Sequence, residues 1–241
     1  MFDHVTIRVS DRSASERFYD TVLAPVGIAK THSGDEFAEW NDFSLAAASG
    51  DHPVTRRLHV AFGAPSRDAV DEFWRVGTEA GYTSDGAPGL RPEYSEDYYG
   101  AFLLDPDGNS AEAVTHETSE NRIDHLWIRV ADVAAAKRFY ETIAPYAGLR
   151  LGYDKLPERV GFSTGGRGSF SLVAGTPTEH VHMAFGADSN STVDEFHRAA
   201  LEAGYRDNGA PGERAVYHPG YYGGFVLDPD GNNVEVVNHN R

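Results

Sequence analysis

The sequence predicts an α+β protein made of four βαβββ modules, arranged as two tandem copies. Three observations support this prediction: an internal duplication, an alternation of strand-like and helix-like segments within each copy, and a composition typical of a folded core. Apolar residues make up 40% and charged residues 24% of the 241-residue chain, close to the averages for globular proteins. A chain of this length accommodates two ordinary domains.

The two halves of the chain repeat each other. Residues 3–9 (DHVTIRV) return as 124–130 (DHLWIRV), and an offset of 123 aligns 57–116 with 180–239, with 34 of 60 positions identical. A repeat this long is a domain rather than a solenoid unit. The polar segment ETSENR (117–122) is the predicted linker. The predicted domains are 1–118, with modules at about 1–52 and 57–116, and 123–241, with modules at about 123–175 and 180–239.

Hydrophobic periodicity gives the elements of the first module. Alternating residues predict a strand over 5–9, and one apolar helical face predicts a helix over 13–23. Two shorter strands are expected at 37–40 and 43–47.

The second module follows the same order. We expect a strand over 58–62, a helix over 66–80 that Gly81 ends as a glycine cap, and strands at 99–104 and 111–116. DPDGN between these strands predicts a turn, because proline fixes φ and Gly or Asn accepts a left-handed conformation. GAPG, at 86–89 and again at 209–212, is also expected to turn; without Lys and Ser/Thr it is no phosphate-binding loop.

Charge and cysteine content exclude several classes of function. The chain has 21 basic and 37 acidic residues, a net charge of −16, and no cysteine. An acidic surface disfavours nucleic acid and anionic membranes, and the lack of cysteine leaves imidazole and carboxylate as metal ligands. No apolar run approaches the ~20 residues of a membrane span, and the N-terminus does not resemble a signal peptide. We therefore expect a cytoplasmic monomer or homodimer whose partner is a small molecule.

Strand parity places a set of polar side chains on one face. Alternate side chains point to opposite faces of a strand, and the apolar faces must cover the helices. The other face then carries His4, Arg8, His59 and Glu112. The second copy repeats them as His125, Arg129, His182 and Glu235.

Two histidines and one glutamate on separate strands make a 2-His-1-carboxylate set. Such ligands suit Fe(II), Zn, Ni or Mn and leave coordination positions open for substrate or oxygen. A hydrogen-bonded structural histidine at His59 and a solvated carboxylate at Glu112 are the alternative interpretations. Arg8 and Arg129 either hold a substrate carboxylate beside the metal or neutralise the glutamates.

Aromatic residues near the last two strands of each copy are candidates for substrate binding. Tyrosines in 94–99 and 217–222 either stack on a planar ligand or pack a strand and its loop. His116 and His239 share the parity of the glutamates and either orient them or lie solvated at the strand end. The candidate tyrosines are Tyr94, Tyr99, Tyr217 and Tyr222, beside Tyr98 and Tyr221.

The motifs resemble those of the vicinal oxygen chelate superfamily, which includes glyoxalase I, methylmalonyl-CoA epimerase, extradiol dioxygenases and the bleomycin- and fosfomycin-resistance proteins. The resemblance rests on DHVTIRV with RFY, on LHVAF and VHMAF, and on YYGAFLLDPDGNSAEAV and YYGGFVLDPDGNNVEVV. It covers nearly the whole chain in both copies. It implies paired modules that form open barrels, and a divalent metal ion. The implied metal ligands are His4, His59, Glu112, His125, His182 and Glu235.

The chain departs from parts of this superfamily in ways that affect the expected chemistry. Its FSLAAA and FSLVAG strands lack the fourth ligand of glyoxalase I and the epimerase, and Phe102 and Phe225 replace a tyrosine of extradiol dioxygenases. The expected function is a metalloenzyme acting as an isomerase, lyase or dioxygenase on a small oxygenated substrate, with the metal as Lewis acid. The alternative is a metal-independent protein that sequesters an aromatic natural product or antibiotic. Each site forms either within one copy or by exchange of modules between copies.

Overall fold

The computed structural model describes residues 1–116, 120–164 and 169–241, so part of the predicted linker lies outside the described residues. The chain divides into two compact units. Unit 1 comprises Met1–Val5 and Ile128–Arg241, and unit 2 comprises Thr6–Trp127. The divisions fall within β1 (His4–Val9) and β9 (Ile123–Val130). Each unit therefore contains most of one predicted copy and the first-strand residues of the other.

The order of elements in both units is that of the predicted modules. The strands of the described residues form two eight-stranded sheets, neither of which closes into a barrel, and this confirms the α+β prediction. Besides its part of β1 and β9, unit 2 contains α1 (Arg12–Leu23), β2 (His32–Ser33), β3 (Phe37–Trp40), β4 (Phe43–Ala47), β5 (His59–Gly63), α2 (Arg67–Glu79), β6 (Ser84–Leu90), β7 (Tyr99–Leu104) and β8 (Ser110–Thr115). Unit 1 contains α3 (Val133–Ala147), β10 (Arg150–Lys155), β11 (Arg159–Ser163), β12 (Ser169–Ala174), β13 (His182–Gly186), α4 (Asn190–Glu202), β14 (Arg206–Glu213), β15 (Tyr222–Leu227) and β16 (Asn233–Asn238).

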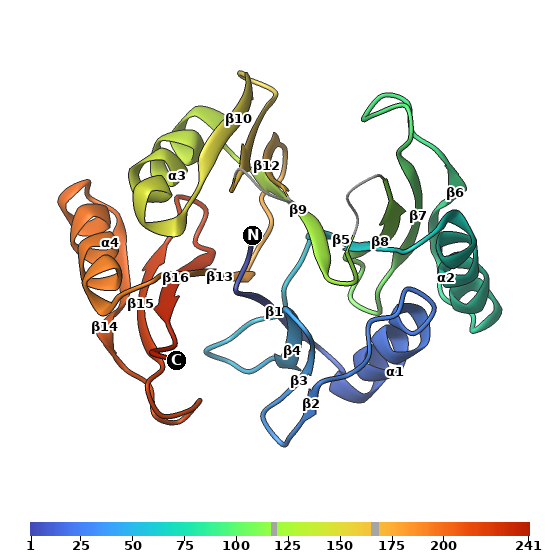
Figure 1. Ribbon diagram of the computed structural model, residues 1–241, viewed down its shortest axis with the longest axis horizontal. Coiled ribbons are helices and arrows are strands. Elements are labelled where there is room, and N and C mark those ends of the chain that lie inside the picture. The colour runs from blue at the N-terminus through green and yellow to red at the C-terminus, as the bar shows by residue number, and fades with distance from the viewer. Residues whose placement is uncertain (117–119, 165–168) are drawn as a thin grey trace. The chain divides into compact units, whose positions relative to one another are not determined.

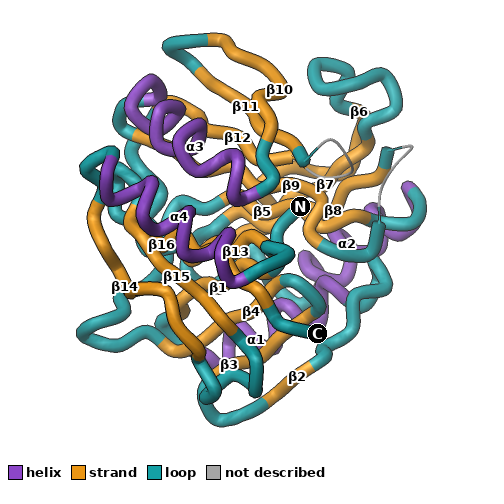
Figure 2. Tube along the Cα trace, turned by 60° about the vertical axis from the view of Figure 1, so that its left-hand side comes forward, coloured by secondary structure: helices purple, strands orange, loops and turns teal. Residues whose placement is uncertain are grey.

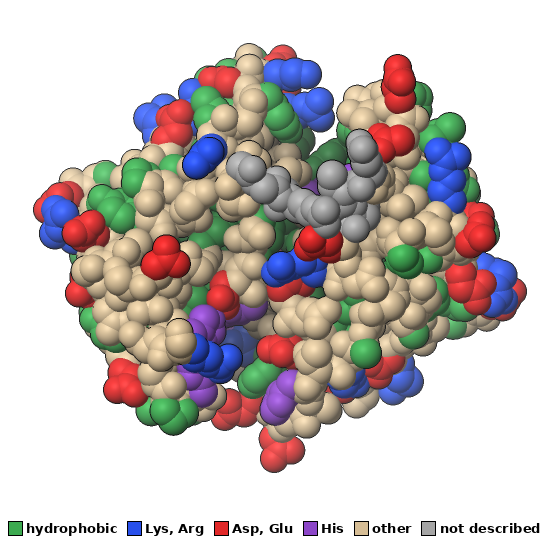
Figure 3. Space-filling view, viewed as in Figure 1, with side chains coloured by type: hydrophobic (Ala, Val, Ile, Leu, Met, Phe, Trp, Pro, Cys, Tyr) green, Lys and Arg blue, Asp and Glu red, His purple; other side chains and the backbone are tan. Residues whose placement is uncertain are grey.

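The described helices cover one face of their strands. Helix α1 packs on α2, and α3 packs on α4 (Figure 1); α4 lies over β14, β15 and β16 (Figure 2). Each helix begins after an Asp or Ser whose side chain accepts a hydrogen bond from an N–H of the first turn, as Ser66 does from Ala69. Gly81, at φ +91°, follows α2 as the predicted glycine cap. None of the described helices is long and apolar enough to span a membrane. Acidic and basic side chains are interspersed over the face seen in Figure 3.

Two GAPG segments that the sequence predicts as turns lie within strands. Gly86–Gly89 belongs to β6, and its repeat belongs to β14. Both strands stand at the outer end of their sheet, and their pairing with β7 and β15 shifts register at the glycines. Proline and glycine are tolerated in an edge strand that bulges, because few ladder hydrogen bonds are lost there. The turn prediction for these segments is therefore wrong.

The register of unit 2 places the predicted ligands on one face. Strand β5 pairs in parallel with β8, where Ala61 stands opposite Glu112. It pairs antiparallel with β9, where Ala61 stands opposite His125. Residues in register point to the same side of a sheet, and His59 is two residues from Ala61. All three ligand candidates therefore project from the same side of three neighbouring strands.

Candidate metal centres

The first of two groups of facing ligands lies in unit 2 and consists of His59, Glu112 and His125, here called the unit-2 triad. Oε2 of Glu112 lies 3.0 Å from Nε2 of His59 and 3.4 Å from Nε2 of His125. All three residues are buried. The carboxylate therefore lies between two imidazoles that converge on one of its oxygens.

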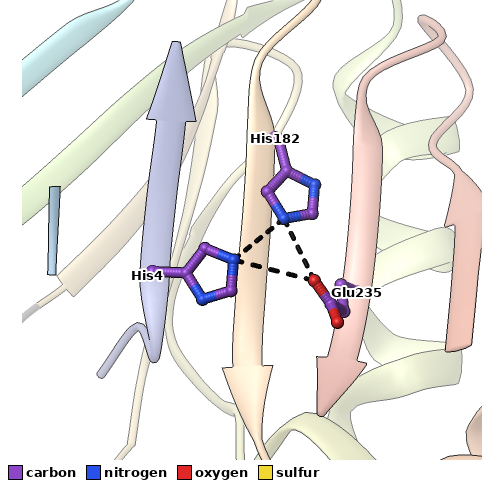
Figure 4. A group of neighbouring side chains, drawn as sticks. All are labelled: His4, His182 and Glu235. Carbon is purple, nitrogen blue, oxygen red and sulfur yellow. Dashed lines mark hydrogen bonds and ion pairs between the residues drawn. The ribbon is translucent and has the colours of Figure 1, made fainter. Parts of the chain in front are cut away.

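The second group lies in unit 1 and consists of His4, His182 and Glu235, here called the unit-1 triad. These side chains project toward one another from β1, β13 and β16 (Figure 4). The two Nε2 atoms lie 3.1 Å apart. Oε2 of Glu235 lies 3.1 Å from Nε2 of His182 and 3.7 Å from Nε2 of His4. Each triad thus combines two histidines and a glutamate that the sequence predicts, drawn from both copies of the repeat.

These separations fit a single divalent ion. Ligand atoms at about 2.0–2.2 Å from one ion are roughly 3.0–3.5 Å apart in octahedral or tetrahedral geometry. Five of the distances between triad atoms lie between 3.0 and 3.7 Å. Two nitrogens and one carboxylate oxygen on one side leave the opposite coordination positions to other ligands.

A carboxylate behind one histidine of each triad sets the orientation of its ring. Nδ1 of His125 lies 2.9 Å from Oδ1 of Asp124, and Nδ1 of His4 lies 2.8 Å from Oδ1 of Asp3. Because a carboxylate only accepts, Nδ1 carries a proton, and whenever the ring is neutral the lone pair of Nε2 faces the triad. Neither aspartate is among the residues predicted from the sequence, although each directly precedes its histidine in the repeated DH motif.

Further histidines contact the aspartates behind the triads, one of them in unit 2 and a chain of two in unit 1. His116 contacts Oδ2 of Asp124 at 2.8 Å. In unit 1, His239 contacts Oδ2 of Asp3 at 2.9 Å, and His218 contacts His239 at 2.8 Å. His116 and His239 therefore orient the aspartates behind the candidate histidine ligands, rather than the glutamates whose parity they share.

A buried tyrosine holds the second oxygen of each glutamate. The hydroxyl of Tyr98 donates to Oε1 of Glu112, and that of Tyr221 donates to Oε1 of Glu235, both at 2.7 Å. Burial raises the pKa of both tyrosines well above the usual value, and the nearby glutamates raise it further. The hydroxyls therefore stay protonated as donors and leave Oε2 to face the imidazoles.

The charges of the unit-2 triad stabilise one another. Burial raises the pKa of Glu112, but hydrogen bonds from His125 and His59 outweigh burial and lower it to about 2. Burial lowers the pKa of His125, but Asp124 and Glu112 outweigh burial and raise it to about 9. In the metal-free protein a proton on His125 therefore supplies the positive charge that the two carboxylates favour.

The tyrosines predicted as substrate-binding residues fall into two groups. In the β7–β8 ladder Tyr99 stands opposite Thr115, and Phe102 stands opposite Glu112. Because Tyr99 and Phe102 are three residues apart, their side chains point to opposite faces of the sheet. The Tyr99 hydroxyl donates to Asp71 of α2, and Tyr222 likewise donates to Asp194 of α4. Tyr99 and Tyr222 therefore lie on the helix-covered face, away from the triads.

Tyr94 and Tyr217 lie nearer the triads. The Tyr94 ring centroid is 5.0 Å from that of Tyr98, and the Tyr217 centroid is 4.9 Å from that of Tyr221. Both Tyr94 and Tyr217 are exposed. Each packs at a tilt against the tyrosine that holds the glutamate.

The two predicted arginines lie at the ends of their strands. The Arg8 guanidinium donates to the Ala47 carbonyl at 3.4 Å. Arg129 is exposed, and its side chain lies beside Gly175. Their assignment to substrate stays a prediction.

Replacing Gly100 with alanine is expected to weaken metal binding in unit 2. A Cβ at this position would lie 2.5 Å from Oε1 of Glu112. Glu112 must then move, and the cost resembles that of losing an outer contact of a metal ligand, about 10–100-fold in affinity. Competition titration with a chromophoric chelator measures the metal affinity of the variant. Gly50→Ala is the control, because nothing lies within 4 Å of its Cβ; equal affinity of both variants would contradict the prediction.

Comparison with known proteins identifies the family and the fold. The model of the Glyoxalase/Bleomycin resistance protein/Dioxygenase superfamily matches the chain over residues 1–113 and 122–236. No curated protein sequence matches the chain. Among solved structures, glyoxalase I from Zea mays is 18% identical over 99% of this chain and 92% of its own, with a TM-score of 0.70.

A putative dioxygenase from Bacillus subtilis is 13% identical over 100% of this chain and 85% of its own, with a TM-score of 0.67. At these identities the solved structures show a shared fold. The family model matches both halves of the chain and leaves out few residues. The chain therefore belongs to the Glyoxalase/Bleomycin resistance protein/Dioxygenase superfamily.

Proposed function

We propose that the protein is a metal-dependent enzyme that binds one divalent ion at each triad and acts on a small oxygenated substrate. One observation carries the proposal: in each unit, two imidazole nitrogens and a carboxylate oxygen from three strands converge within 4.8 Å of one another. The aspartate behind one histidine and the tyrosine behind the glutamate are typical supports of a metal ligand. Fe, Zn, Ni and Mn suit this ligand set.

The residues of each centre have distinct roles in this proposal. A bound divalent ion supplies Lewis-acid stabilisation of negative charge that develops on a substrate oxygen. Tyr98 and Tyr221 hold one glutamate oxygen so that the other faces the ion site. Phe102 and Phe225 lie beside His59 and His182, with ring centroids 6.0 and 6.2 Å apart, and give each site an apolar wall on that side. The proposed reactions are isomerase, lyase or dioxygenase chemistry.

Elemental analysis of untagged protein, purified without added metal or chelator, tests the proposal. We expect up to two equivalents of Fe, Ni, Zn or Mn, completed to two on reconstitution. His59→Ala and His182→Ala should each bind one equivalent less, because each removes a ligand from a different triad. Wild-type protein that takes up no metal on reconstitution would overturn the proposal.

Paired substitutions test which histidines act together. The triads predict that His59→Ala/His125→Ala loses one equivalent, since both residues belong to unit 2. They predict that His4→Ala/His59→Ala loses both equivalents, one from each unit. The opposite result would mean that each site forms within one sequence copy.

A metal-independent binding protein for planar aromatic compounds is the second candidate. The observation that favours it is the ring cluster in unit 2, where Tyr94 lies 5.6 Å from Trp127 and 5.0 Å from Tyr98. Tryptophan fluorescence titration with a panel of planar aromatic compounds tests it. Tight binding that a chelator leaves unchanged would support this function, and the lack of any binding would exclude it.

A further inference from the structure

The two triads have the same ligand types but differ in exposure. The side chains of His4 and His182 in unit 1 are 23% and 19% exposed. Those of His59 and His125 in unit 2 are 10% and 5% exposed. Both glutamates are equally buried, at 1%. The difference therefore lies in the exposure of the imidazoles.

In unit 2 an indole packs against both imidazoles of the triad. Trp127 is two residues beyond His125 in β9, on the same face of the strand. Its ring centroid lies 5.0 Å from that of His59 and 5.9 Å from that of His125. Tyr94 packs edge-on against the indole at 5.6 Å. Trp127, which packs against both imidazoles of the unit-2 triad, and Tyr94, which packs on Trp127, are here called the aromatic cap.

The repeat does not supply this cap in the other copy. The offset that aligns His4 with His125 aligns Thr6 with Trp127. Tyr217, the counterpart of Tyr94, is 56% exposed and packs at a tilt against Tyr221. A threonine cannot form the ring contacts by which an indole covers two imidazoles.

We propose that the unit-1 triad is the accessible site, where a small oxygenated substrate reaches the ion, and that the unit-2 triad retains its ion behind the aromatic cap. This inference rests on the proposed function, since both triads must bind metal. Ligand and metal exchange need a path by which water, chelator or substrate approaches the ion. The indole blocks that path in unit 2, and exposed imidazole edges leave it open in unit 1.

Release of metal to a chelator tests the difference in exchange. Protein loaded with two equivalents of Zn is mixed with excess chromophoric chelator, and release is followed by absorbance. We expect two phases of equal amplitude, with the slow phase up to about tenfold slower, a factor within the range of aromatic contact energies. His59→Ala should retain only the fast phase, and His182→Ala only the slow phase.

Substitution of the indole assigns the slow phase to the cap. Trp127→Thr introduces the residue of the other copy and should accelerate the slow phase toward the fast one. Trp127→Phe keeps an aromatic ring and should leave release slow. Trp74→Thr is the matched control, because Trp74 lies on α2 and donates to Ser84. A slow phase that Trp127→Thr does not change would overturn the role of the cap.

Water access to the ion gives an independent measurement. Loaded with Mn(II), His59→Ala holds its ion only in unit 1 and His182→Ala only in unit 2. We expect His59→Ala to relax water protons more strongly than His182→Ala does. Equal relaxation, or a single phase of release from the wild type, would overturn this inference while leaving the proposed function intact. Failure to bind two equivalents would instead count against the proposed function.

Discussion

Replacing Asp105 with alanine is expected to lower the free energy of unfolding of unit 2 by about 3–5 kcal/mol. Asp105 is 4% exposed and begins the DPDGN turn between β7 and β8. Its carboxylate accepts hydrogen bonds from the N–H groups of Asp107 and Asn109, from the Asn109 amide and from the Tyr19 hydroxyl, at 2.8–3.1 Å. Alanine leaves all four donors without this acceptor, and an unpaired buried donor costs about 1–3 kcal/mol.

The same turn also positions the start of β5. Oδ1 of Asn109 accepts from the Leu58 N–H at 3.1 Å, and its Nδ2 donates to the Thr55 carbonyl at 3.1 Å. Because β5 and β8 carry His59 and Glu112, we expect Asp105→Ala to weaken metal binding as well. The DPDGN motif therefore has a structural role, since it positions the two strands that present the ligands.

Chemical denaturation followed by tryptophan fluorescence measures the effect, because Trp40, Trp74 and Trp127, the three tryptophans of the chain, all lie in unit 2. Asp51→Ala, at an exposed position, is the control. Tyr19→Phe removes one of the four donors, so Asp105→Ala should cost less in that background. A loss below about 1 kcal/mol, the average for point substitutions, would contradict the expected role of the carboxylate.

Local patterns predicted most of the fold, because each pattern needs only neighbouring residues. Alternation along β1 predicts its buried residues, and the structure buries Val5, Ile7 and Val9. Parity also predicted which face carries the histidines and the glutamates. Parity did not apply to the tyrosines, which were chosen for their nearness to the last two strands, and Tyr98 precedes β7. The tyrosine that touches Glu112 therefore lies in the loop, one position before Tyr99.

The grouping of the triads depends on long-range pairing that the duplicated sequence leaves ambiguous. His4 and His125 occur in nearly identical segments, so local sequence cannot decide which of them joins His59. In unit 2 the pairing of β5 with β9 brings in His125. In unit 1 the Asp3 N–H donates to the Ala184 carbonyl of β13 and places His4 beside His182. The pairing of the strands therefore determines which of His4 and His125 joins each triad, which the repeated sequence alone does not.

The stability of the metal-free protein is expected to fall as the pH rises from 6.5 to about 9. The pKa of His125 is raised from 6.5 to about 9 in the folded state, by Asp124 and Glu112 against the effect of burial. A raised pKa contributes stability that is fully present below pH 6.5 and is lost as the pH passes through the folded value. This difference between the ordinary and the folded-state pKa of His125 corresponds to roughly 3 kcal/mol in the free energy of unfolding.

A divalent ion should cancel this trend, because it takes the place of the proton on Nε2 of His125, the atom that faces Glu112. Binding requires neutral His125, so below about pH 9 each ion displaces a proton and its affinity rises by up to about tenfold per pH unit. The stabilisation of unit 2 by added Zn should therefore grow between pH 6.5 and 9, measured by denaturation with and without chelator. His52→Asn, at an exposed histidine of unit 2, should retain the trend, and His125→Asn should abolish it. A pH dependence that survives in His125→Asn would show that another group carries the exchangeable proton.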